Sequence, residues 1–361
     1  MSPIKVALVF GITGQDGSYL AELLIQKGYI VHGARRRTSS FNTSRIDHLI
    51  ENSQIWNSRF FLHHCDLSDQ SSIDRLLTSL NVDEIYNLAA QSHVGVSFEQ
   101  PLYTSDINAL GTLRILESIV RNCDIKNVKY YQASTSELFG LRKLDNDGLL
   151  NEASLFQPQS PYAVSKQFAF QCVELFRASH NLFAVNGILF NHESERRGET
   201  FVTRKITRAL SRIKVGIQSE LLLGNLNACR DWGHAKDYVR AMQMMLQLDS
   251  PTDLVIATGM SVTVRNFVEM VAVRLDFDLE WSGVDAEEIG IDRKTGNIIV
   301  RVDRGYFRPL EVDYLRGDAS KALSVMGWRP TISLDELVDE MTHGDLLRAK
   351  SESVNPGIFR I

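Results

Sequence analysis

The sequence predicts an α/β protein with a doubly wound parallel sheet and a smaller C-terminal α/β lobe. Two observations support this prediction. Short apolar runs alternate with helical patterns through the first half of the chain, and a glycine-rich turn follows the first run. The 361 residues are 44% hydrophobic and 23% charged, which is ordinary for a globular protein with a sizeable core.

The first apolar run, Val6–Phe10, leads into the turn and then into an amphipathic stretch through Leu24. This order of strand, glycine turn and helix is typical of the Rossmann-type dinucleotide-binding unit, in which backbone N–H groups approach a pyrophosphate at the helix N-terminus. The residues of the turn are therefore predicted to bind a cofactor: Gly11, Ile12, Thr13, Gly14, Gln15, Asp16 and Gly17.

The next strand, Ile30–Ala34, ends in three arginines at 35–37. Folds of this kind that use NAD usually carry an acid here to bind the ribose 2′-hydroxyl, whereas a guanidinium can bind a 2′-phosphate. NADP is therefore the predicted cofactor, with Arg36 as a contact. The alternative is a set of exposed arginines at a strand end.

Strands at Phe60–Leu67 and Ile85–Ala90 continue the βα repeat. Asp66, at the end of the strand Phe60–Leu67, could accept a hydrogen bond from an adenine amino group. The small residues from Leu88 to Ser92 suit a backbone that passes close to a cofactor. The run His63–Cys65 does not favour a metal site, because consecutive strand residues face opposite ways.

The central stretch begins with an apolar strand at Val128–Gln132. If extended geometry continues, Thr135 and Glu137 share a face. Ser160 and Pro161 suit the N-cap and first position of a helix, on which Tyr162 and Lys166 are one turn apart. The predicted apolar stripe of this helix comprises Val164, Phe168, Cys172, Leu175 and Phe176.

A tyrosine and a lysine at this spacing, above a dinucleotide site, indicate hydride transfer from an alcohol. The tyrosine must lose its proton near neutral pH, and lowering its pKa by roughly three pH units takes about 4 kcal/mol. The positive charge of the Lys166 ammonium would lower this pKa, because it favours the phenolate form of the tyrosine. A carboxylate at Glu137 could in addition remove a proton α to the new ketone, giving a net dehydration. The alternative is that Glu137 caps a helix or pairs with an arginine.

Bulk properties limit the possible partners. The net charge of −5 argues against a general nucleic-acid binder, and neither a membrane span nor a signal peptide is evident. Four scattered cysteines favour a reducing, cytoplasmic compartment over disulfides or zinc. The basic segment 196–214 could bind a diphosphate, or could be a solvated helix.

In the second half, an apolar strand at Phe183–Phe190 precedes the basic segment. A helix at Tyr238–Leu248 and a strand at Leu254–Thr258 are predicted to return to the sheet. A helix is expected over 261–275, a loop over 284–300 and a last helix over 334–342, capped by Ser333 with Glu336.

These boundaries predict a dinucleotide-binding domain over 1–187, rejoined by about 234–259. The lobe is expected to comprise 188–233 and 260–345, followed by a tail over 346–361.

Several longer motifs accompany the glycine turn, and those from residue 186 onwards are far more selective than the glycines. They are Tyr-Gln-Ala-Ser-Thr-Ser-Glu-Leu-Phe-Gly at 131–140, Asn-Gly-Ile-Leu-Phe-Asn-His-Glu-Ser at 186–194, Arg-Arg-Gly-Glu-Thr-Phe-Val-Thr-Arg-Lys at 196–205, Leu-Gly-Asn-Leu at 223–226, Arg-Asp-Trp-Gly-His-Ala-Lys-Asp-Tyr-Val at 230–239 and Tyr-Phe-Arg-Pro at 306–309. Through them the chain resembles the extended short-chain dehydrogenase/reductases, and within these the GDP-mannose 4,6-dehydratases, over roughly residues 4–345.

This resemblance implies tightly held NADP, GDP-mannose as substrate and GDP-4-keto-6-deoxymannose as product. By analogy, Tyr162 takes the 4-hydroxyl proton while hydride passes from C4 to NADP⁺. Lys166 lowers the tyrosine pKa and binds the nicotinamide ribose, and Thr135 binds the forming keto oxygen. Glu137 removes the C5 proton and returns it to the departing C6 hydroxyl, before hydride returns to C6.

The resemblance also extends the predicted sites, and it implies a homodimer or homotetramer with the arginine-rich loop near 35–45 at a subunit contact. The cofactor positions are Gly11 to Asp16, Arg36, Asp66, Leu67, Leu88, Ala89, Ala90, Gln91, Ser92, Tyr103, Tyr162, Lys166, His192 and Arg197. The substrate positions are Ser92, Asn191, Val202, Lys205, Gly224, Arg230, Arg308 and Glu311.

Departures from the family pattern include Phe139, where tyrosine is frequent, and Glu195, where proline is common. Ser136 stands where related nucleotide-glucose dehydratases carry aspartate, which favours the mannose type. One alternative substrate is a GDP-manno-heptose, and another activity is a GDP-sugar epimerase or 4-reductase. A catalytically silent binding module would be expected to lack one of the four catalytic residues.

Overall fold

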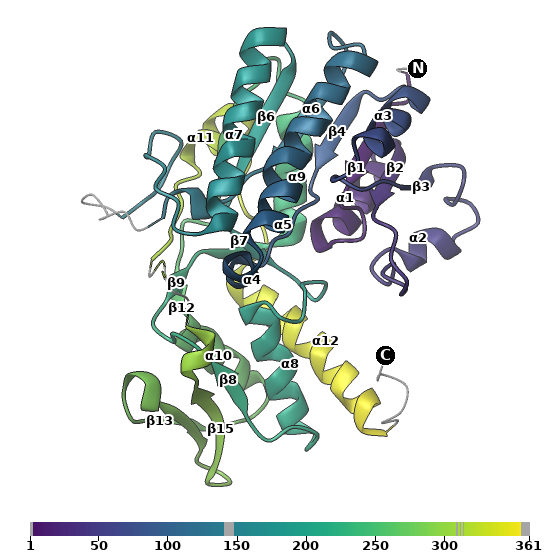
Figure 1. Ribbon diagram of the computed structural model, residues 1–361. Coiled ribbons are helices and arrows are strands. Elements are labelled where there is room, and N and C mark those ends of the chain that lie inside the picture. The colour runs from purple at the N-terminus through teal and green to yellow at the C-terminus, as the bar shows by residue number, and fades with distance from the viewer. Residues whose placement is uncertain (1–2, 141–147, 308–309, 311, 313, 355–361) are drawn as a thin grey trace. The chain divides into compact units, whose positions relative to one another are not determined.

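The computed structural model describes residues 3–140, 148–307, 310, 312 and 314–354 (Figure 1). These residues divide into two compact units, each built from separate stretches of chain. Unit 1 comprises Met1–Phe190, Ala235–Ala257 and Gly317–Arg329; unit 2 comprises Asn191–His234, Thr258–Arg316 and Pro330–Ile361.

Unit 1 is centred on a seven-stranded sheet in the order β11-β6-β5-β4-β1-β2-β3. Every pairing in it is parallel, which confirms the predicted doubly wound sheet and the return of the second half of the chain to it. Its strands are β1 (Val6–Phe10), β2 (Ile30–Arg35), β3 (Phe60–His64), β4 (Glu84–Asn87), β5 (Lys129–Ala133), β6 (Phe183–Leu189) and β11 (Leu254–Ile256).

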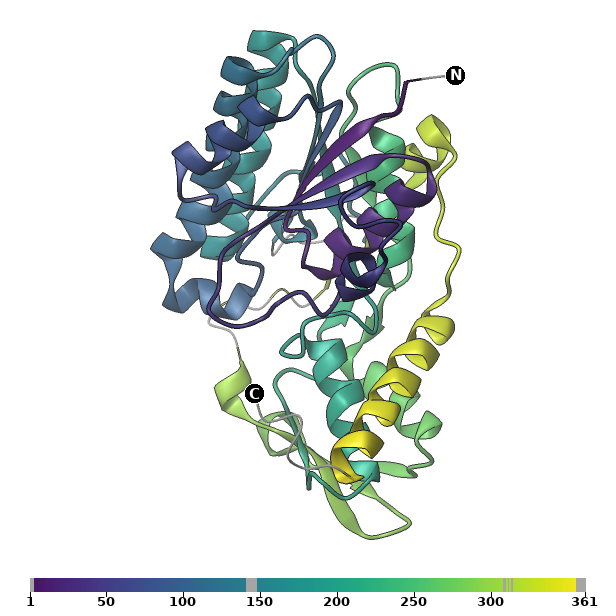
Figure 2. The ribbon, with the colours of Figure 1, turned by 90° about the vertical axis from the view of Figure 1, so that its right-hand side faces the viewer.

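Helices cover both faces of this sheet (Figure 2). One apolar core includes residues of α1, α9 and α11, and the other includes residues of α3, α6 and α7. The helices of unit 1 are α1 (Gln15–Gln26), α2 (Asp47–Glu51), α3 (Gln70–Ser79), α4 (Val94–Glu99), α5 (Pro101–Ser105), the π-helix η1 (Asp106–Leu110), α6 (Gly111–Asn122), the 3₁₀ helix η2 (Ser136–Leu138), α7 (Pro161–His180), α9 (Ala235–Met245) and α11 (Ser320–Met326).

Helix α7 begins as predicted, with Ser160 at the N-cap accepting a hydrogen bond from the Ala163 N–H. The predicted apolar stripe is only partly right: Cys172 is buried and Phe176 packs against the core, but Val164, Phe168 and Leu175 are 55%, 40% and 61% exposed. The helix instead buries the face of Tyr162, Lys166, Ala169 and Val173. Both stripes have helical spacing, so periodicity alone could not distinguish them.

Unit 2 contains a four-stranded sheet in the order β13-β14-β15-β8 and two short two-stranded pairings, β10-β7 and β12-β9. Helices α8, α10 and α12 contribute to its apolar core. Its elements are β7 (Asn191–Glu193), α8 (Val202–Lys214), β8 (Leu221–Leu223), β9 (Cys229–Arg230), β10 (Trp232–His234), β12 (Val262–Thr263), α10 (Val264–Arg274), β13 (Leu279–Ser282), η3 (Asp285–Glu287), β14 (Ile289–Asp292), β15 (Asn297–Val302), η4 (Arg304–Tyr306) and α12 (Leu334–Val354).

Two expectations for this part of the chain are wrong. The predicted loop over 284–300 contains β14 and most of β15, which pair with each other around a register shift. The last helix has the predicted capping box of Ser333 and Glu336, but it continues to Val354 because residues such as Asp345 and Ala349 are buried. None of the helices in the described stretches is long and apolar enough to cross a membrane.

Candidate active site

The glycine turn lies between β1 and α1, at the carboxyl edge of the sheet. Gly11 has a φ of +80°, and a Cβ atom there would lie 2.8 Å from the Ala89 backbone nitrogen. A Cβ atom on Gly17 would meet the Gly11 carbonyl oxygen. Because Gly11 and Gly17 have no side chains, the segment after β1 can lie close to the segment after β4. The two predicted cofactor loops meet there.

The segment after β4 is held by a residue that the sequence analysis missed. The side chain of Asn108, in η1, accepts a hydrogen bond from the Gln91 N–H at 2.9 Å and donates to the Gln91 carbonyl at 3.0 Å. It also donates to the hydroxyl of Ser165 on α7 at 3.2 Å. A π-helical turn is typical of functional sites, but this one has no sequence signal beyond an asparagine in a helical run.

Two of the predicted cofactor positions, Arg36 and Tyr103, contact each other. The Arg36 guanidinium donates to the Tyr103 hydroxyl at 2.7 Å, although the two residues are far apart in the sequence. Asp66 follows β3, and its carboxylate accepts hydrogen bonds from the N–H and hydroxyl of Ser68. The next residue, Leu67, is buried.

Beyond β5 the extended geometry ends earlier than expected. Thr135 is extended, with φ −152° and ψ 147°, but its hydroxyl accepts a hydrogen bond from the Glu137 N–H at 3.2 Å and starts η2. Strand alternation therefore does not relate Thr135 to Glu137, and that argument is wrong. Both residues still lie directly after β5, with Thr135 buried and Glu137 half-buried.

Tyr162 and Lys166 occupy the first turns of α7, on its buried face. The Lys166 ammonium is 6.0 Å from the centroid of the Tyr162 ring and donates to the Ala133 carbonyl at 2.9 Å. Burial lowers the pKa of Lys166 to about 8, against an opposing effect of Asp16. A cation held next to a phenol favours the phenolate, so the pair is suited to accept a proton from an alcohol.

Unit 2 carries the other predicted positions. His192 is buried in β7, whereas Arg197 stacks on Phe201 and pairs with the carboxylate of Glu193 at 3.0 Å. Among the described residues, the side-chain oxygen of Asn191 is buried without a hydrogen-bond partner. Such an oxygen is costly unless a ligand donates to it.

Lys205 and Gly224 meet at Tyr306. The Lys205 ammonium lies 3.2 Å from the centroid of the Tyr306 ring, and burial lowers the pKa of Lys205 to about 8. A Cβ atom on Gly224 would lie 2.7 Å from the Tyr306 carbonyl oxygen. Lys205 lies on α8, and Val202 is the first residue of that helix. Arg308 and Glu311 lie outside the described residues.

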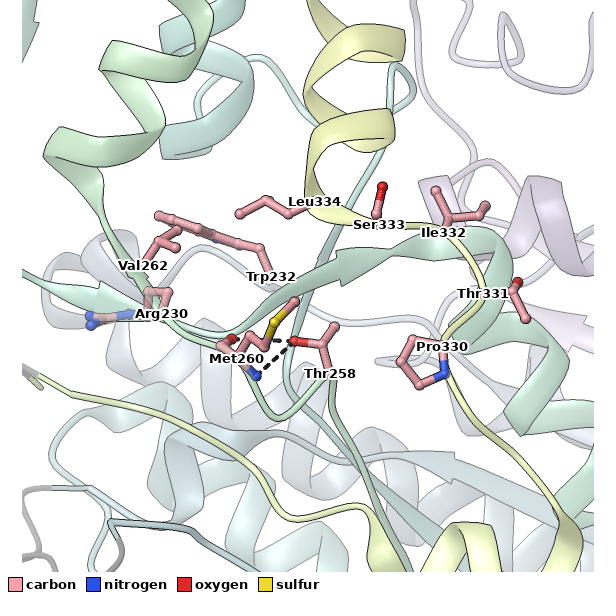
Figure 3. A pocket seen from close by; sticks show the side chains of 10 residues that line it. All are labelled: Arg230, Trp232, Thr258, Met260, Val262, Pro330, Thr331, Ile332, Ser333 and Leu334. Atoms are coloured by element: carbon pink, nitrogen blue, oxygen red, sulfur yellow. Dashed lines mark hydrogen bonds between the residues drawn. The ribbon is translucent and has the colours of Figure 1, made fainter.

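A small cavity of about 240 Å³ lies in unit 2, next to Arg230 (Figure 3). Figure 3 shows the Arg230 side chain extending away from Thr258 and Met260, which hydrogen-bond each other. The other lining residues are Trp232, Val262, Pro330, Thr331, Ile332, Ser333 and Leu334.

The basic segment is neither a solvated helix nor uniformly available to a diphosphate. Arg204 is buried and pairs with Asp345 of α12, while Arg208 pairs with Glu199. Arg212 pairs with Glu352, also of α12. In the chain as far as it is described, no group of three His, Cys, Asp or Glu side chains could hold a metal ion.

Comparison with known proteins identifies the family. Residues 8–341 match the family model described as GDP-mannose 4,6 dehydratase. The chain belongs to this family. A GDP-mannose 4,6-dehydratase from Yersinia enterocolitica is 53% identical, with 97% of this chain and 96% of the relative covered. The human GDP-mannose 4,6 dehydratase is 50% identical, with 95% and 92% covered.

Solved structures with the same fold are more distant in sequence. A UDP-glucose 4-epimerase from Thermotoga maritima has a TM-score of 0.76 at 21% identity, over 96% of this chain and 100% of that one. A dTDP-glucose 4,6-dehydratase from Bacillus anthracis, in complex with NAD, has a TM-score of 0.76 at 20% identity, over 96% and 97%. They confirm the fold of this GDP-mannose 4,6-dehydratase family member.

Proposed function

We propose that this chain dehydrates GDP-mannose to GDP-4-keto-6-deoxymannose by internal oxidation, elimination and reduction, with NADP as a recycled cofactor. The observation that carries the proposal is its 53% identity to a curated GDP-mannose 4,6-dehydratase over nearly the full chain. The placement of Thr135 and Glu137 after β5, and of Tyr162 and Lys166 on the buried face of α7, supports it.

The residues of unit 1 fit a nicotinamide dinucleotide. At Gly11 the chain passes so close to the Ala89 backbone that a Cβ atom would not fit, and α1 begins just beyond this turn, where its N-terminal dipole favours a pyrophosphate. Arg36, oriented by Tyr103, is suited to a ribose 2′-phosphate and therefore favours NADP over NAD. When bound, the nicotinamide supplies the hydride acceptor for C4 and the hydride donor for C6.

The protein side chains then move protons. Tyr162 takes the proton of the sugar 4-hydroxyl, and the adjacent Lys166 ammonium stabilises the phenolate that makes this possible. Thr135 donates a hydrogen bond to the oxygen that becomes the ketone. Its hydroxyl hydrogen is available for this, because the hydroxyl oxygen already accepts from the Glu137 N–H.

Glu137 distinguishes a dehydratase from a simple reductase or epimerase. After C4 becomes a ketone, the C5 proton is acidified, and the Glu137 carboxylate removes it. The same carboxyl group then protonates the departing C6 hydroxyl, so that water leaves. When hydride returns to C6, C5 takes up a proton, which balances the proton that Tyr162 took from the 4-hydroxyl. General acid–base catalysis of this kind contributes about 10²–10⁴-fold in rate.

Unit 2 supplies the candidate nucleotide-sugar contacts. Lys205 and Arg230 would neutralise the diphosphate, and the unpartnered Asn191 oxygen would accept from a ligand donor. On this proposal unit 1 is the NADP-binding domain and unit 2 the GDP-sugar lobe.

The exposed apolar side chains of α7 support a homodimer or homotetramer. All four cysteines are thiols, which supports a cytoplasmic location. Sedimentation of the purified chain would report the assembly, and a monomer at micromolar concentration would contradict it.

The decisive experiment is incubation of the purified protein with GDP-mannose and no added reductant, followed by mass spectrometry. Loss of one water is expected. A Glu137→Gln variant should release water about 10²–10⁴-fold more slowly, while transient absorbance of reduced nicotinamide persists. The control Glu117→Gln changes an exposed carboxylate that pairs with Arg121 on α6, and it should be fully active.

Two results would contradict the proposal. Full dehydration by the Glu137→Gln variant would refute the role of that residue. Conversion of a GDP-manno-heptose in preference to GDP-mannose would show that the heptose derivative, and not GDP-mannose, is the substrate.

A further inference from the structure

A set of buried polar side chains lies beside the catalytic lysine and takes no part in the proposed chemistry. Gln132, near the end of β5, is 1% exposed, and its neighbours Asn87 on β4, Tyr130 on β5 and Thr112 on α6 are equally buried. Most polar groups that are buried in this way hydrogen-bond, and these side chains bond one another, although the Asn87 side-chain oxygen has no partner. The set therefore has a defined geometry.

The orientation of the Gln132 amide is determined by its partners. Its oxygen accepts hydrogen bonds from the Tyr130 hydroxyl at 2.6 Å, from the Asn87 amide at 2.9 Å and from the Thr112 hydroxyl at 3.3 Å. The Asn87 amide also donates to the Thr112 hydroxyl at 3.3 Å. Since these three donors converge on the oxygen, the Gln132 NH₂ group must point the other way.

That NH₂ group donates to the carbonyl oxygen of Ala133 at 3.1 Å. The same oxygen accepts a hydrogen bond from the Lys166 ammonium at 2.9 Å. We propose that Gln132 is a positioning residue, whose amide occupies one lone pair of the Ala133 carbonyl and confines the Lys166 ammonium to the other. This inference rests on the proposed function, because Lys166 acts there on Tyr162.

The number of lone pairs and donors explains why the Gln132 amide would restrict the Lys166 ammonium. A carbonyl oxygen has two lone pairs, and an ammonium has three N–H donors on a flexible four-carbon stem. Without the Gln132 amide, the ammonium could centre itself on the carbonyl and leave its position beside the Tyr162 ring. Small displacements of catalytic groups are costly, with up to about 100-fold in rate for about 1 Å.

Two variants separate positioning from general stability. Gln132→Met removes the amide at nearly constant length. The control Tyr130→Phe removes the hydroxyl that donates to the Gln132 oxygen, yet it leaves the hydrogen bond from the Gln132 NH₂ group to the Ala133 carbonyl in place. Both remove a buried hydrogen bond from the same cluster. For Gln132→Met we expect kcat for GDP-mannose to fall about 10–100-fold with KM within about twofold, whereas Tyr130→Phe should keep kcat within about threefold.

A measurement independent of activity follows Lys166 itself. In protein labelled with ¹³C at the lysine ε-carbon, the Lys166 resonance is identified by its loss in Lys166→Met. The chemical shift of this resonance should change in Gln132→Met and remain the same in Tyr130→Phe. If Gln132→Met does not fold, Gln132→Glu retains an oxygen for Tyr130 and Asn87, lacks the amide, and should show the same loss of kcat and the same shift.

The outcomes are distinguishable. Equal kcat and an unshifted Lys166 resonance in both variants would overturn the positioning role, even in an active dehydratase. A shifted resonance in Gln132→Met alone, in a protein that does not dehydrate GDP-mannose, would support the positioning role and refute the proposed function.

Discussion

The buried ion pair between α8 and α12 gives a quantitative prediction about stability. Arg204 and Asp345 are 5% and 2% exposed, and the Arg204 Nε atom donates to both carboxylate oxygens at 2.9 and 2.7 Å. Thr207 donates to the same carboxylate at 2.7 Å. Changing Asp345 to alanine leaves the guanidinium buried without a counter-charge, because its other acceptors are the backbone carbonyls of residues 195 and 197.

Removal of one partner of a buried ion pair typically costs about 3–5 kcal/mol. At about 2–4 °C per kcal/mol for a domain of this size, Asp345→Ala should lower the Tm by roughly 6–20 °C. Arg204→Met alone should also be costly, because it leaves the Asp345 carboxylate buried. The double variant should be more stable than the sum of the two losses predicts, because no charge is then left without its partner.

The assay is thermal and urea unfolding of the wild type, the two single variants and the double variant. Arg348→Met is the matched control, because Arg348 contacts Asp345 at 3.4 Å but is 45% exposed, and surface pairs contribute about 0–1 kcal/mol. A loss below about 1 kcal/mol for Asp345→Ala, or strictly additive losses, would refute the reasoning that this pair is a desolvated charge pair.

Three further predictions concern unit 1. Gly11→Ala should abolish tight NADP binding, measured by fluorescence titration, because the positive φ and the approach to Ala89 exclude a Cβ atom; wild-type affinity would contradict this. Arg36→Glu should weaken binding of NADP more than of NAD, since a carboxylate repels the 2′-phosphate; an unchanged preference would remove Arg36 from that role. Burial, with a smaller effect of His63, lowers the pKa of His32 from 6.5 to about 4. The unfolded state therefore binds this proton more readily, and stability should fall as the pH decreases from about 6.5 towards 4. His32→Gln should flatten this part of the urea-unfolding profile, and an identical profile would show that His32 does not contribute.

Much of unit 1 was predictable because local signals and tertiary demands agree there. The glycine turn has its sequence signature for steric reasons that the structure shows at Gly11 and Gly17. The helix start at Ser160 and Pro161 was predictable from capping chemistry, which acts between residues close in sequence. In unit 2 the same holds for the capping box of Ser333 and Glu336.

The errors occur where distant residues decide the outcome. Helix α7 buries its Tyr162 and Lys166 face and exposes an apolar one, because contacts with the sheet override hydrophobic periodicity. The charge of Arg204 indicated a solvent-exposed or ligand-binding residue, since its partner Asp345 lies 141 residues further along the chain. Asn108 and Gln132 gave no signal, because their partners come from several separate elements.

The alternation of chain segments between the two units limits how the enzyme can be altered by recombination. The backbone passes from one unit to the other after residues 190, 234, 257, 316 and 329. No single crossover can exchange unit 2 for that of a relative; a chimaera must replace three separate fragments at once. On the proposal that unit 2 binds the sugar, new sugar preferences are therefore expected to arise by point substitutions and short loop changes rather than by the exchange of the whole unit.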